Sequence, residues 1–559
     1  MTLNSPELQN LLPISLFILR ILVPFLSVVV VVKCFSSLKK GRRKEDPVVL
    51  LEDMTTKEAL PVLYWENSLG RSKSCDIILH DATASRNHAV LMRREKGWML
   101  SDTGSKAGTF LNGKKVESST KIVPGDIIAM GSTALMFKRT AEGKPQSVRR
   151  IFHAASPFGL MLRVTLIQLL LFVQSSFATG AFQNQSAIPF GALVVMEWAL
   201  YLYSMKGLGR VSFELETVGF LLSSIGIMLI AGTGGMKNLY TQLAALAVGI
   251  VLFCVIIWFL NDLDRVMKFR LYIGAAAVVL FAANLLLARS QNGARNWINF
   301  GFVSVQPSEF IKIAFIFVGA STLDRLQTAK NLTGFITFSA VCMGALFLMR
   351  DFGTACVFFV TFLIIAFMRS GSVRTIALIC AVAVFGAFLI IKIKPYVAQR
   401  FEAWRHVWEF ANEAGGYQQT RVLSYSASGG LFGVGLGKGR LKSVFAATSD
   451  LMFGMICEEL GLILAVVVVL SLAMLLFYAR SDATRSRSTF YSISACAAAG
   501  LMLFQTSLNI FGATDVLPLT GVTLPFVSLG GSSMVSVWGL LAFIKASDER
   551  TYAARRKKK

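Results

Sequence analysis

Charged residues and histidine are scarce in this chain of 559 residues. Asp, Glu, Lys and Arg make up only 16% of the sequence, hydrophobic residues make up 54%, and there are four histidines. This composition excludes an ordinary soluble protein and predicts a polytopic α-helical membrane protein. No cluster of side chains has metal-ligand spacing, so no cofactor is certain and a requirement for a divalent cation stays open.

Paired cysteines and acidic charge are lacking as well. The eight cysteines have no paired spacing and mostly lie in apolar runs, which predicts small core side chains rather than a disulfide framework. The 32 acidic residues face 56 basic ones, a formal net charge of +24. In a membrane protein this excess indicates basic loops beside anionic lipid, and we predict no nucleic-acid partner.

The apolar stretch at residues 11–32 begins the membrane part. It is long enough to cross about 30 Å of hydrocarbon as a helix. No small-residue cleavage site follows it, so we interpret residues 1–46 as a retained signal-anchor with a basic linker. The basic cluster at 39–44 predicts an N-terminus outside the cell and a cytoplasmic domain next in the chain.

Residues 47–140 show the period-two alternation of short strands separated by turn residues, for example at Ala89–Met92 and Ile127–Met130. This pattern predicts a soluble all-β sandwich. Its turns contain the sequences Gly70-Arg71-Ser72, Ser85-Arg86-Asn87-His88, Gly104-Ser105-Lys106-Ala107-Gly108-Thr109 and Asn112-Gly113. These matches, in this order, resemble the signature of a forkhead-associated (FHA) domain.

The resemblance implies a phosphothreonine-binding module whose loops lie at one end of the sandwich. A phosphate favours a guanidinium and a hydroxyl donor, which Arg71 and Ser85 would supply. Lys106 and Asn112 are further predicted contacts. At residue 107 the family usually has Asn and this chain has Ala, which affects peptide selectivity. The alternative is a sandwich that serves only as a spacer or docking surface.

Twelve more apolar runs follow a basic linker and bring the predicted spans to about thirteen. They lie near residues 158–179, 188–204, 214–232, 239–260, 271–288, 308–323, 333–349, 352–369, 374–393, 456–479, 489–512 and 532–546. Counting sides from an external N-terminus places the Lys- and Arg-rich loops and the tail 549–559 in the cytoplasm. The same count places the polar loop 394–459 outside the cell.

Four stretches of the second half share a second resemblance. They are Gly293 to Ile298 with Gln306 to Lys312, Arg350 to Ala355, the loop 394–459, and Leu517 to Ser533. Together they resemble the SEDS family of bacterial peptidoglycan polymerases (FtsW, RodA and SpoVE). The resemblance covers residues 213–548 as a ten-helix core and leaves two extra spans within 141–212. It implies a bacterial plasma membrane protein.

The residues fit such a polymerase chemically. A prenyl-diphosphate sugar donor requires cations, which Arg295 and Lys312 would supply near the outer ends of spans. The other predicted substrate contacts are Trp297, Glu309, Tyr417, Gln418 and Ser532. The alternative for the charged members is a set of structural ion pairs. The prolines and glycines within 517–531 predict a re-entrant segment lining a protein-walled cavity.

The large loop departs from the family at two acidic positions, one of them in the Leu-Pro-Glu that usually precedes Thr-Asp and is absent before Asp450. Glycosyl transfer needs a carboxylate base, and the family presents an Asp shortly before its Gly-Tyr-Gln element. Here Phe410 or Ala411 stands at that position. Candidate catalytic acids are therefore Glu409, Glu413, Asp351 and Asp450.

Three functions stay open from the sequence. The first is an FHA-regulated glycosyltransferase that polymerises lipid II with a class B penicillin-binding protein as its transpeptidase. The second is a degenerate scaffold recruited by phosphothreonine proteins, and the third is a lipid II flippase. The sequence does not distinguish division from elongation or sporulation.

Overall fold

The computed structural model describes residues 6–40, 49–62, 66–72, 75–94, 97–117, 119–139, 155–178, 184–210, 212–288, 295–301, 304–322, 329–370, 373–393, 401–413, 416–483, 486 and 488–548. Three predicted features lie wholly or partly outside these residues. They are the basic linker after residue 139, the first residues of the loop 394–459, and the tail 549–559.

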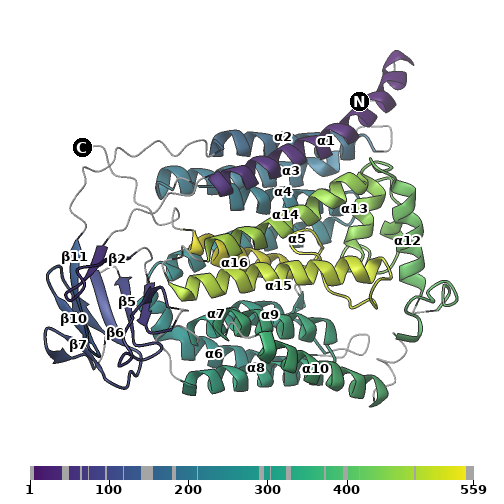
Figure 1. Ribbon diagram of the computed structural model, residues 1–559. Coiled ribbons are helices and arrows are strands. Elements are labelled where there is room, and N and C mark those ends of the chain that lie inside the picture. The colour runs from purple at the N-terminus through teal and green to yellow at the C-terminus, as the bar shows by residue number, and fades with distance from the viewer. Residues whose placement is uncertain are drawn as a thin grey trace.

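A two-sheet sandwich forms the β-rich part, as predicted for residues 47–140 (Figure 1). One sheet has the order β2-β1-β11-β10-β7-β8 and the other β4-β3-β5-β6-β9. The strands are β1 Val49–Asp53, β2 Ala59–Val62, β3 Glu66–Gly70, β4 Ile77–Ile78, β5 Ala89–Arg94, β6 Gly97–Asp102, β7 Thr109–Leu111, β8 Lys114–Lys115, β9 Thr120–Ile122, β10 Ile127–Met130 and β11 Thr133–Arg139. Alternate side chains such as Leu91, Leu100 and Leu135 are fully buried between the sheets.

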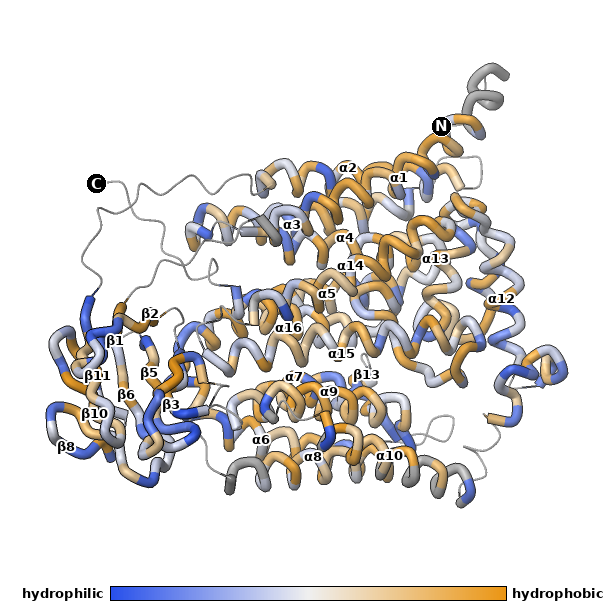
Figure 2. The backbone as a smooth tube through the Cα atoms, in the orientation of Figure 1, coloured by the Kyte–Doolittle hydropathy of each residue, from blue (hydrophilic) through white to orange (hydrophobic). Residues whose placement is uncertain are grey.

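Helices form most of the rest of the described chain. They are α1 Pro6–Lys40, α2 Pro157–Ser176, α3 Ala187–Leu202, α4 Glu214–Ala231, α5 Met236–Leu260, α6 Leu263–Leu287, α7 Pro307–Thr322, α8 Ala329–Met349, α9 Phe352–Ser370, α10 Val373–Ile393, α12 Tyr417–Gly429, α13 Met452–Leu460, α14 Leu462–Asp482, α15 Thr489–Ala513 and α16 Gly531–Ser547. Nine helices in the described ranges are long and apolar enough to cross a membrane. Hydrophobic residues run along these helices, and hydrophilic ones gather in the sandwich and beyond the helix ends (Figure 2). The predicted polytopic helical fold is confirmed.

One predicted span is not continuous. The sequence favours a single helix over 456–479, whereas α13 ends at Leu460 and α14 begins at Leu462. Gly461 separates them with φ of 88°, a conformation that glycine adopts without a steric penalty. A Cβ at this position would lie 2.3 Å from the carbonyl oxygen of Leu431, so the break also admits the backbone of the large loop.

The centre of the bundle is formed by α4, α5 and α16. Every residue of α4 is buried. Trp538 of α16 packs edge-on against Phe220 of α4 and Phe253 of α5, with ring centroids 5.0 and 5.7 Å apart. Gly219 and Gly249 make room for it, since a Cβ at either position would lie 3.2 Å from the Trp538 side chain.

The two extra spans, α2 and α3, join this core through polar side chains. Gln168 of α2 is fully buried, and its amide donates to Glu197 of α3 at 2.7 Å and to Ser224 of α4 at 2.9 Å. Buried polar groups that bond across helices fix how the helices pack. The hairpin α2–α3 is therefore an integral part of the bundle.

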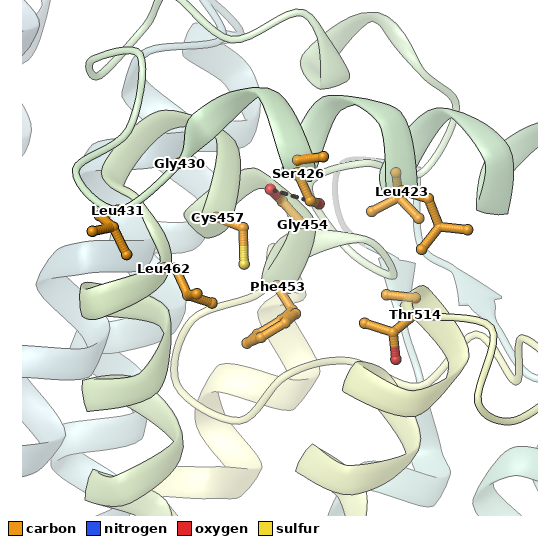
Figure 3. A pocket seen from close by; sticks show the side chains of 12 residues that line it. Leu423, Ser426, Gly430, Leu431, Phe453, Gly454, Cys457, Leu462 and Thr514 are labelled. Carbon is orange, nitrogen blue, oxygen red and sulfur yellow. Dashed lines mark hydrogen bonds between the residues drawn. The ribbon is translucent and has the colours of Figure 1, made fainter.

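The large loop and the sandwich lie at opposite ends of the helix bundle (Figure 1). At the loop end, α12 and α13 pack over the ends of α14 and α15. A mainly apolar, partly open pocket of about 380 Å³ lies at this end, and the residues that line it include Leu423, Phe453, Leu462 and Thr514 (Figure 3).

Candidate functional site

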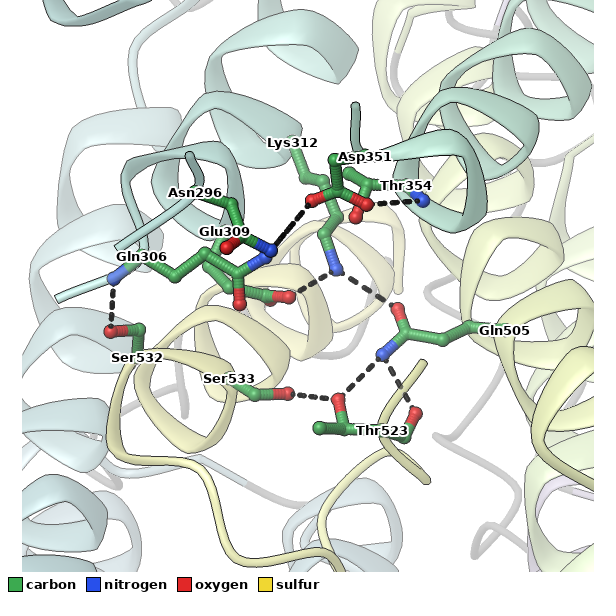
Figure 4. A network of polar contacts seen from close by, with 10 residues as sticks. All are labelled: Asn296, Gln306, Glu309, Lys312, Asp351, Thr354, Gln505, Thr523, Ser532 and Ser533. Carbon is green, nitrogen blue, oxygen red and sulfur yellow. Dashed lines mark hydrogen bonds and ion pairs between the residues drawn. The ribbon is translucent and has the colours of Figure 1, made fainter. Parts of the chain in front are cut away.

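A buried lysine is the centre of a polar network inside the bundle (Figure 4). Lys312 on α7 is 2% exposed, and its Nζ donates to Glu309 Oε1 at 2.7 Å and to Gln505 Oε1 of α15 at 3.0 Å. Glu309 precedes it by one helical turn, which puts both charges on one face. A buried charge is stable only when paired and hydrogen-bonded, and both conditions are met here.

The network continues from Gln505 to the start of α16. The Gln505 amide donates to the carbonyl and the hydroxyl of Thr523, at 2.9 and 3.1 Å, and Thr523 bonds to Ser533 at 2.9 Å. The predicted Ser532 lies beside it and accepts from the Gln306 backbone amide at 3.0 Å. Ser532 thus ties the entry to α7 to the first turn of α16.

Asp351 lies at the start of α9, next to this network. Its Oδ1 accepts from the Thr354 backbone amide at 3.1 Å, a helix-capping contact. Its Oδ2 faces the side-chain amides of Asn296 at 3.4 Å and Gln306 at 3.3 Å. The helix N-terminus and two amide donors stabilise its negative charge.

The predicted substrate contacts Arg295 and Trp297 flank Asn296. Arg295 is exposed, and its backbone amide donates to the Met349 carbonyl at 3.0 Å. Trp297 is half-buried, directly before the short hairpin of β12 (Ile298–Asn299) and β13 (Ser304–Val305). Arg295 therefore lies next in the chain to Asn296, which contacts Asp351, and its side chain is exposed.

The segment between α15 and α16 is irregular, as its prolines and glycines predict. Side chains from other elements satisfy its peptide groups: Asn509 donates to the Val522 carbonyl at 2.8 Å, and Gln242 donates to the Ser528 carbonyl at 3.1 Å. Non-helical backbone is tolerated in a membrane domain only where protein or water covers it. Asp450 lies against this segment, since a Cβ at Gly521 would be 3.4 Å from its Oδ2.

Four polar atoms of this region are buried and have no hydrogen-bond partner within the described ranges. They are Ser308 Oγ, Glu309 Oε2, Asn509 Oδ1 and Thr520 Oγ1. Unsatisfied buried groups cost about 1–3 kcal/mol each, and a bound water or a polar ligand would satisfy them. With Lys312 and Arg295, the region can bind an anionic, hydroxyl-rich group.

The predicted loop acids lie in a different environment. Glu409 is 74% exposed in its side chain, and its Oε1 is 3.3 Å from His406 Nδ1. Glu413 is also exposed, and its carbonyl accepts from the backbone amides of Gly416 and Tyr417 at the start of α12. In the described part of the chain, no hydrogen bond or ion pair joins either carboxylate to the Lys312 network.

The predicted Tyr417 and Gln418 make local contacts on α12. The Arg421 guanidinium lies 5.0 Å from the centre of the Tyr417 ring, which is 40% exposed. The Gln418 amide donates to the Phe445 carbonyl at 2.8 Å. Gln418 thus braces α12 against the segment that leads to Asp450.

Two buried glutamates of α13 hold the end of the glycine run 429–437 and the residues that follow it. Glu458 accepts from the backbone amides of Arg440 at 2.7 Å and Leu441 at 2.9 Å, and Glu459 accepts from the Gly437 amide at 2.6 Å. Burial raises the pKa of Glu459 to about 7.

The N-terminal helix also reaches the glycine run, a contact that sequence reasoning missed. Arg20 of α1 donates to the Gly433 carbonyl at 3.3 Å, and its guanidinium covers Gly435, where a Cβ would lie 2.7 Å from Nη2. Phe17, one turn earlier, meets Phe432 with ring centroids 6.5 Å apart. The one charge in the otherwise apolar stretch 11–32 was the available signal.

Three of the four predicted phosphopeptide residues come together at one end of the sandwich. The Arg71 backbone amide donates to the Ser85 carbonyl at 3.0 Å, and Ser85 Oγ accepts from the Lys106 backbone amide at 3.0 Å. The side chains of Arg71 and Lys106 are exposed. His88 is buried beneath these loops: Nδ1 accepts from the Ser85 amide, and Nε2 lies 3.1 Å from the Gly108 carbonyl.

The loop that carries Lys106 is held by Asp102. This carboxylate accepts from the backbone amides of Gly104 and Ser105 and from the hydroxyls of Ser105 and Thr109, at 2.5 to 3.0 Å. Partial burial favours its neutral form, but these four hydrogen bonds prevail and keep the pKa of Asp102 below its usual value.

Asn112 has a different place from the other three predicted residues. It lies in the turn between β7 and β8 with φ of 49°, and its amide donates to Asp126 at 2.8 Å while its Oδ1 accepts from the Ile127 amide at 2.9 Å. Its side chain is therefore engaged by the start of β10 rather than extended toward the Arg71 loop.

The sandwich contacts the helix bundle through Glu66. Its Oε2 accepts from the backbone amide and the hydroxyl of Thr489, at 2.7 and 2.9 Å. Thr489 is the first residue of α15, where a carboxylate is favoured by the helix dipole. The same helix carries Gln505 and Asn509 at its other end, so one helix links the sandwich to the polar network.

The sequence did not identify three amide side chains that contact the network or the irregular segment: Gln505, Asn509 and Gln242. Gln505 and Asn509 are four residues apart in an apolar segment, which places them on one helix face. Within the described ranges, no group of three or more His, Cys, Asp or Glu side chains is arranged to hold a metal ion.

Two family models match the chain. The model of the FtsW, RodA and SpoVE proteins, described as a cell cycle protein, matches residues 213–552, and the FHA domain model matches residues 67–131. The first match covers more than half of the chain and contains the whole polar network.

Individual proteins match over the same region. A probable peptidoglycan glycosyltransferase FtsW of Tolumonas auensis is 34% identical over 350 residues, which cover 59% of this chain and 90% of that protein. The peptidoglycan glycosyltransferase RodA of Mycobacterium tuberculosis is 27% identical over 317 residues, covering 53% and 67%. One solved structure is described as showing structural coordination of polymerization and crosslinking by a peptidoglycan synthase complex. A chain of that structure is 23% identical to this one with a TM-score of 0.51, and the match covers 60% of this chain and 96% of that one.

Proposed function

Because the chain belongs to the FtsW/RodA/SpoVE family of membrane proteins and also carries an FHA domain, we propose that it is a peptidoglycan glycosyltransferase regulated by phosphothreonine. Its substrate is lipid II, a prenyl-diphosphate-linked disaccharide peptide, which it polymerises into glycan strands. The names of the FtsW and RodA relatives support the reaction class.

The observation that carries the proposal is the buried network around Lys312. A charged side chain inside a bilayer domain is costly and in general marks a functional position. Here the lysine, Glu309 with one unsatisfied oxygen, and Asp351 lie close to an exposed arginine, Arg295. Lys312 and Arg295 would neutralise the diphosphate, which leaves with the electron pair of the broken bond.

We propose that the loop end of the bundle faces the outside of the cell and the sandwich faces the cytoplasm. The supporting observation is that the two lie at opposite ends of the helices (Figure 1). Lipid II would then meet the loop in the outer leaflet, and phosphorylated proteins would meet the Arg71 loop inside. The basic loops at the sandwich end would contact anionic lipid.

Cross-linking of the glycan would come from a class B penicillin-binding protein as partner. The test of the whole proposal is polymerisation of purified lipid II by the full chain in proteoliposomes together with that partner. Glycan strands that lengthen with time are the expected result. An inert wild-type protein, or transport of labelled lipid II across the bilayer without polymer, contradicts the proposal.

A scaffold recruited by phosphothreonine proteins is the second candidate. The observation that favours it is the assembled loop end, where Arg71, Ser85 and Lys106 converge while the large loop lacks the family's acid. The full chain in nanodiscs should bind a phosphothreonine peptide, and Arg71→Ala should weaken binding at least about tenfold, as expected for losing a charge-assisted pair. Arg139→Ala, an exposed arginine at the far end of β11, is the matched control. If Arg71→Ala bound the phosphothreonine peptide as tightly as the wild type, these loops would not bind the phosphate.

A further inference from the structure

The large loop resembles one that presents a catalytic acid shortly before its Gly-Tyr-Gln element, but the two acids nearest that position are exposed. They are Glu409, which faces His406, and Glu413. Asp450, the other candidate acid of the loop, lies against Gly521. A further carboxylate meets the loop from outside it. Asp515, which follows α15, has its Oδ1 3.3 Å from the Arg405 backbone amide and 3.4 Å from the Gln419 side-chain amide.

Asp515 is held in place by its backbone. Its φ of 58° lies in the left-handed region, which residues other than glycine, asparagine and aspartate seldom adopt. The turn is closed by the backbone amides of Val516 and Leu517, which both donate to the Phe511 carbonyl at 2.9 Å. Trp404 of the loop fastens it further by donating to the Val516 carbonyl at 3.1 Å. Strained positions that the surroundings hold in this way occur often at functional sites.

Asp515 follows the end of α15, a helix whose polar side leads from the network toward the loop. Gln505 contacts Lys312, Asn509 contacts the Asp450 and Val522 carbonyls, and the Gly512 carbonyl accepts from Gln419. These three residues follow at intervals of three or four, which is one side of a helix. At 1.5 Å per residue, the last residue of α15, Ala513, lies about 12 Å beyond Gln505 toward the loop end, and Asp515 comes two residues later.

The environment of Asp515 differs from that of the other candidate acids. It is half-buried, and it forms no ion pair with another residue in the described part of the chain. Its two contacts are long, so the carboxylate keeps the capacity to accept a shorter hydrogen bond from a bound hydroxyl. Asp351, in contrast, is committed to the cap of α9 and to two amides.

We propose that Asp515 is the general base of glycosyl transfer in this protein and replaces the acid missing from the loop. The proposal rests on the function proposed above. The diphosphate lies at Lys312, and the acceptor sugar lies beyond it under the loop. A new bond forms between the acceptor hydroxyl oxygen and the anomeric carbon of the donor, while the bond from that carbon to the diphosphate oxygen breaks. The diphosphate leaves with the electron pair, and the hydroxyl proton passes to Asp515.

The decisive variant is Asp515→Asn in the full chain, reconstituted with its transpeptidase partner and lipid II. Asparagine tolerates the left-handed conformation and keeps an oxygen that accepts from Gln419, but it cannot take up the proton. The expected result is a fall in kcat of at least about 100-fold with KM unchanged. An unchanged thermal unfolding midpoint would show that the loop contact survives. Glu402→Gln, an exposed acid of the same loop, is the matched control and should keep wild-type activity.

Two results would overturn the assignment while leaving the polymerase intact. One is wild-type kcat for Asp515→Asn, which would mean that Asp515 only holds the loop in place. In that case Asp515→Ala, which removes the contacts to the loop, should lower the unfolding midpoint. The other is loss of kcat in Glu409→Gln or Glu413→Gln but not in Asp515→Asn. A wild-type protein without polymerase activity removes the proposed function and this base with it.

Discussion

Replacement of Lys312 by methionine tests whether the buried pair is structural or functional. Methionine is of similar length and fills the same space without charge. The change leaves the Glu309 carboxylate buried without its cation and removes the donor to Gln505 Oε1. Removing one member of a buried ion pair typically costs about 3–5 kcal/mol. Lys312→Met alone should therefore lower the unfolding midpoint strongly, whatever the role of the pair.

The double variant Lys312→Met with Glu309→Met separates the two roles. It removes both charges, so the remaining cost is the lost hydrogen bond to Gln505, about 1 kcal/mol. Its unfolding midpoint in nanodiscs should lie well above that of Lys312→Met. If the pair serves catalysis, this stable protein should still polymerise lipid II at least about 100-fold more slowly than the wild type, the usual loss for one electrostatic contact to a transition state.

A second buried pair in the same bundle supplies the control. Lys545 and Glu216 are 2.9 Å apart and fully buried, and Lys545 lies 13 residues beyond Ser532 on α16, or about 20 Å from the network. Replacing both by methionine should leave polymerisation near wild type. Wild-type activity in the Lys312→Met, Glu309→Met protein would refute the functional role and leave only a structural ion pair.

Three further predictions concern other contacts. Burial raises the pKa of Glu459 to about 7 from an ordinary 4.5, so the folded state binds a proton more tightly than the unfolded state. The free energy of unfolding should therefore fall by roughly 3 kcal/mol as pH rises between these values. Unfolding midpoints measured across this range should decrease in the wild type, and this decrease should be absent in Glu459→Gln. Glu66→Ala should speed hydrogen exchange at the Thr489 amide, and an unchanged rate would mean that the sandwich does not hold α15. Arg20→Ala should likewise speed exchange in the glycine run near Gly433, whereas protection equal to wild type would discount the α1 contact.

Local patterns predicted the elements of the fold well. Apolar length predicted the helices, and period-two alternation predicted the sandwich. The prolines and glycines after α15 predicted irregular backbone, because neither residue suits a continuous helix in lipid. Glu309 and Lys312 were recognised as a site or as structural ion pairs because charged residues are costly near the outer ends of apolar spans.

Contacts between distant segments were beyond the sequence. Nothing local pairs Lys312 with Gln505, almost two hundred residues later, or Arg20 with Gly433. Asp515 was overlooked for the same reason, since its neighbours in space are Arg405 and Gln419. The break at Gly461 was missed because the residues on both sides are apolar, and only the packed backbone of Leu431 shows why the helix stops there.

The place of α1 changes what a truncation experiment measures. A chain shortened to begin at α2 would lose the FHA domain, but it would also strip Phe17 and Arg20 from the glycine run. Inactivity of that chain would then be attributed to lost signalling, although the truncation had also removed two side chains that pack on the large loop. Excising the sandwich while keeping α1 joined to α2 isolates the signalling effect, since α1 and α2 pack together and Ser37 of α1 accepts from the Ala155 amide just before α2. In chain order, the sandwich is a domain inserted between two helices that pack against each other, α1 and α2.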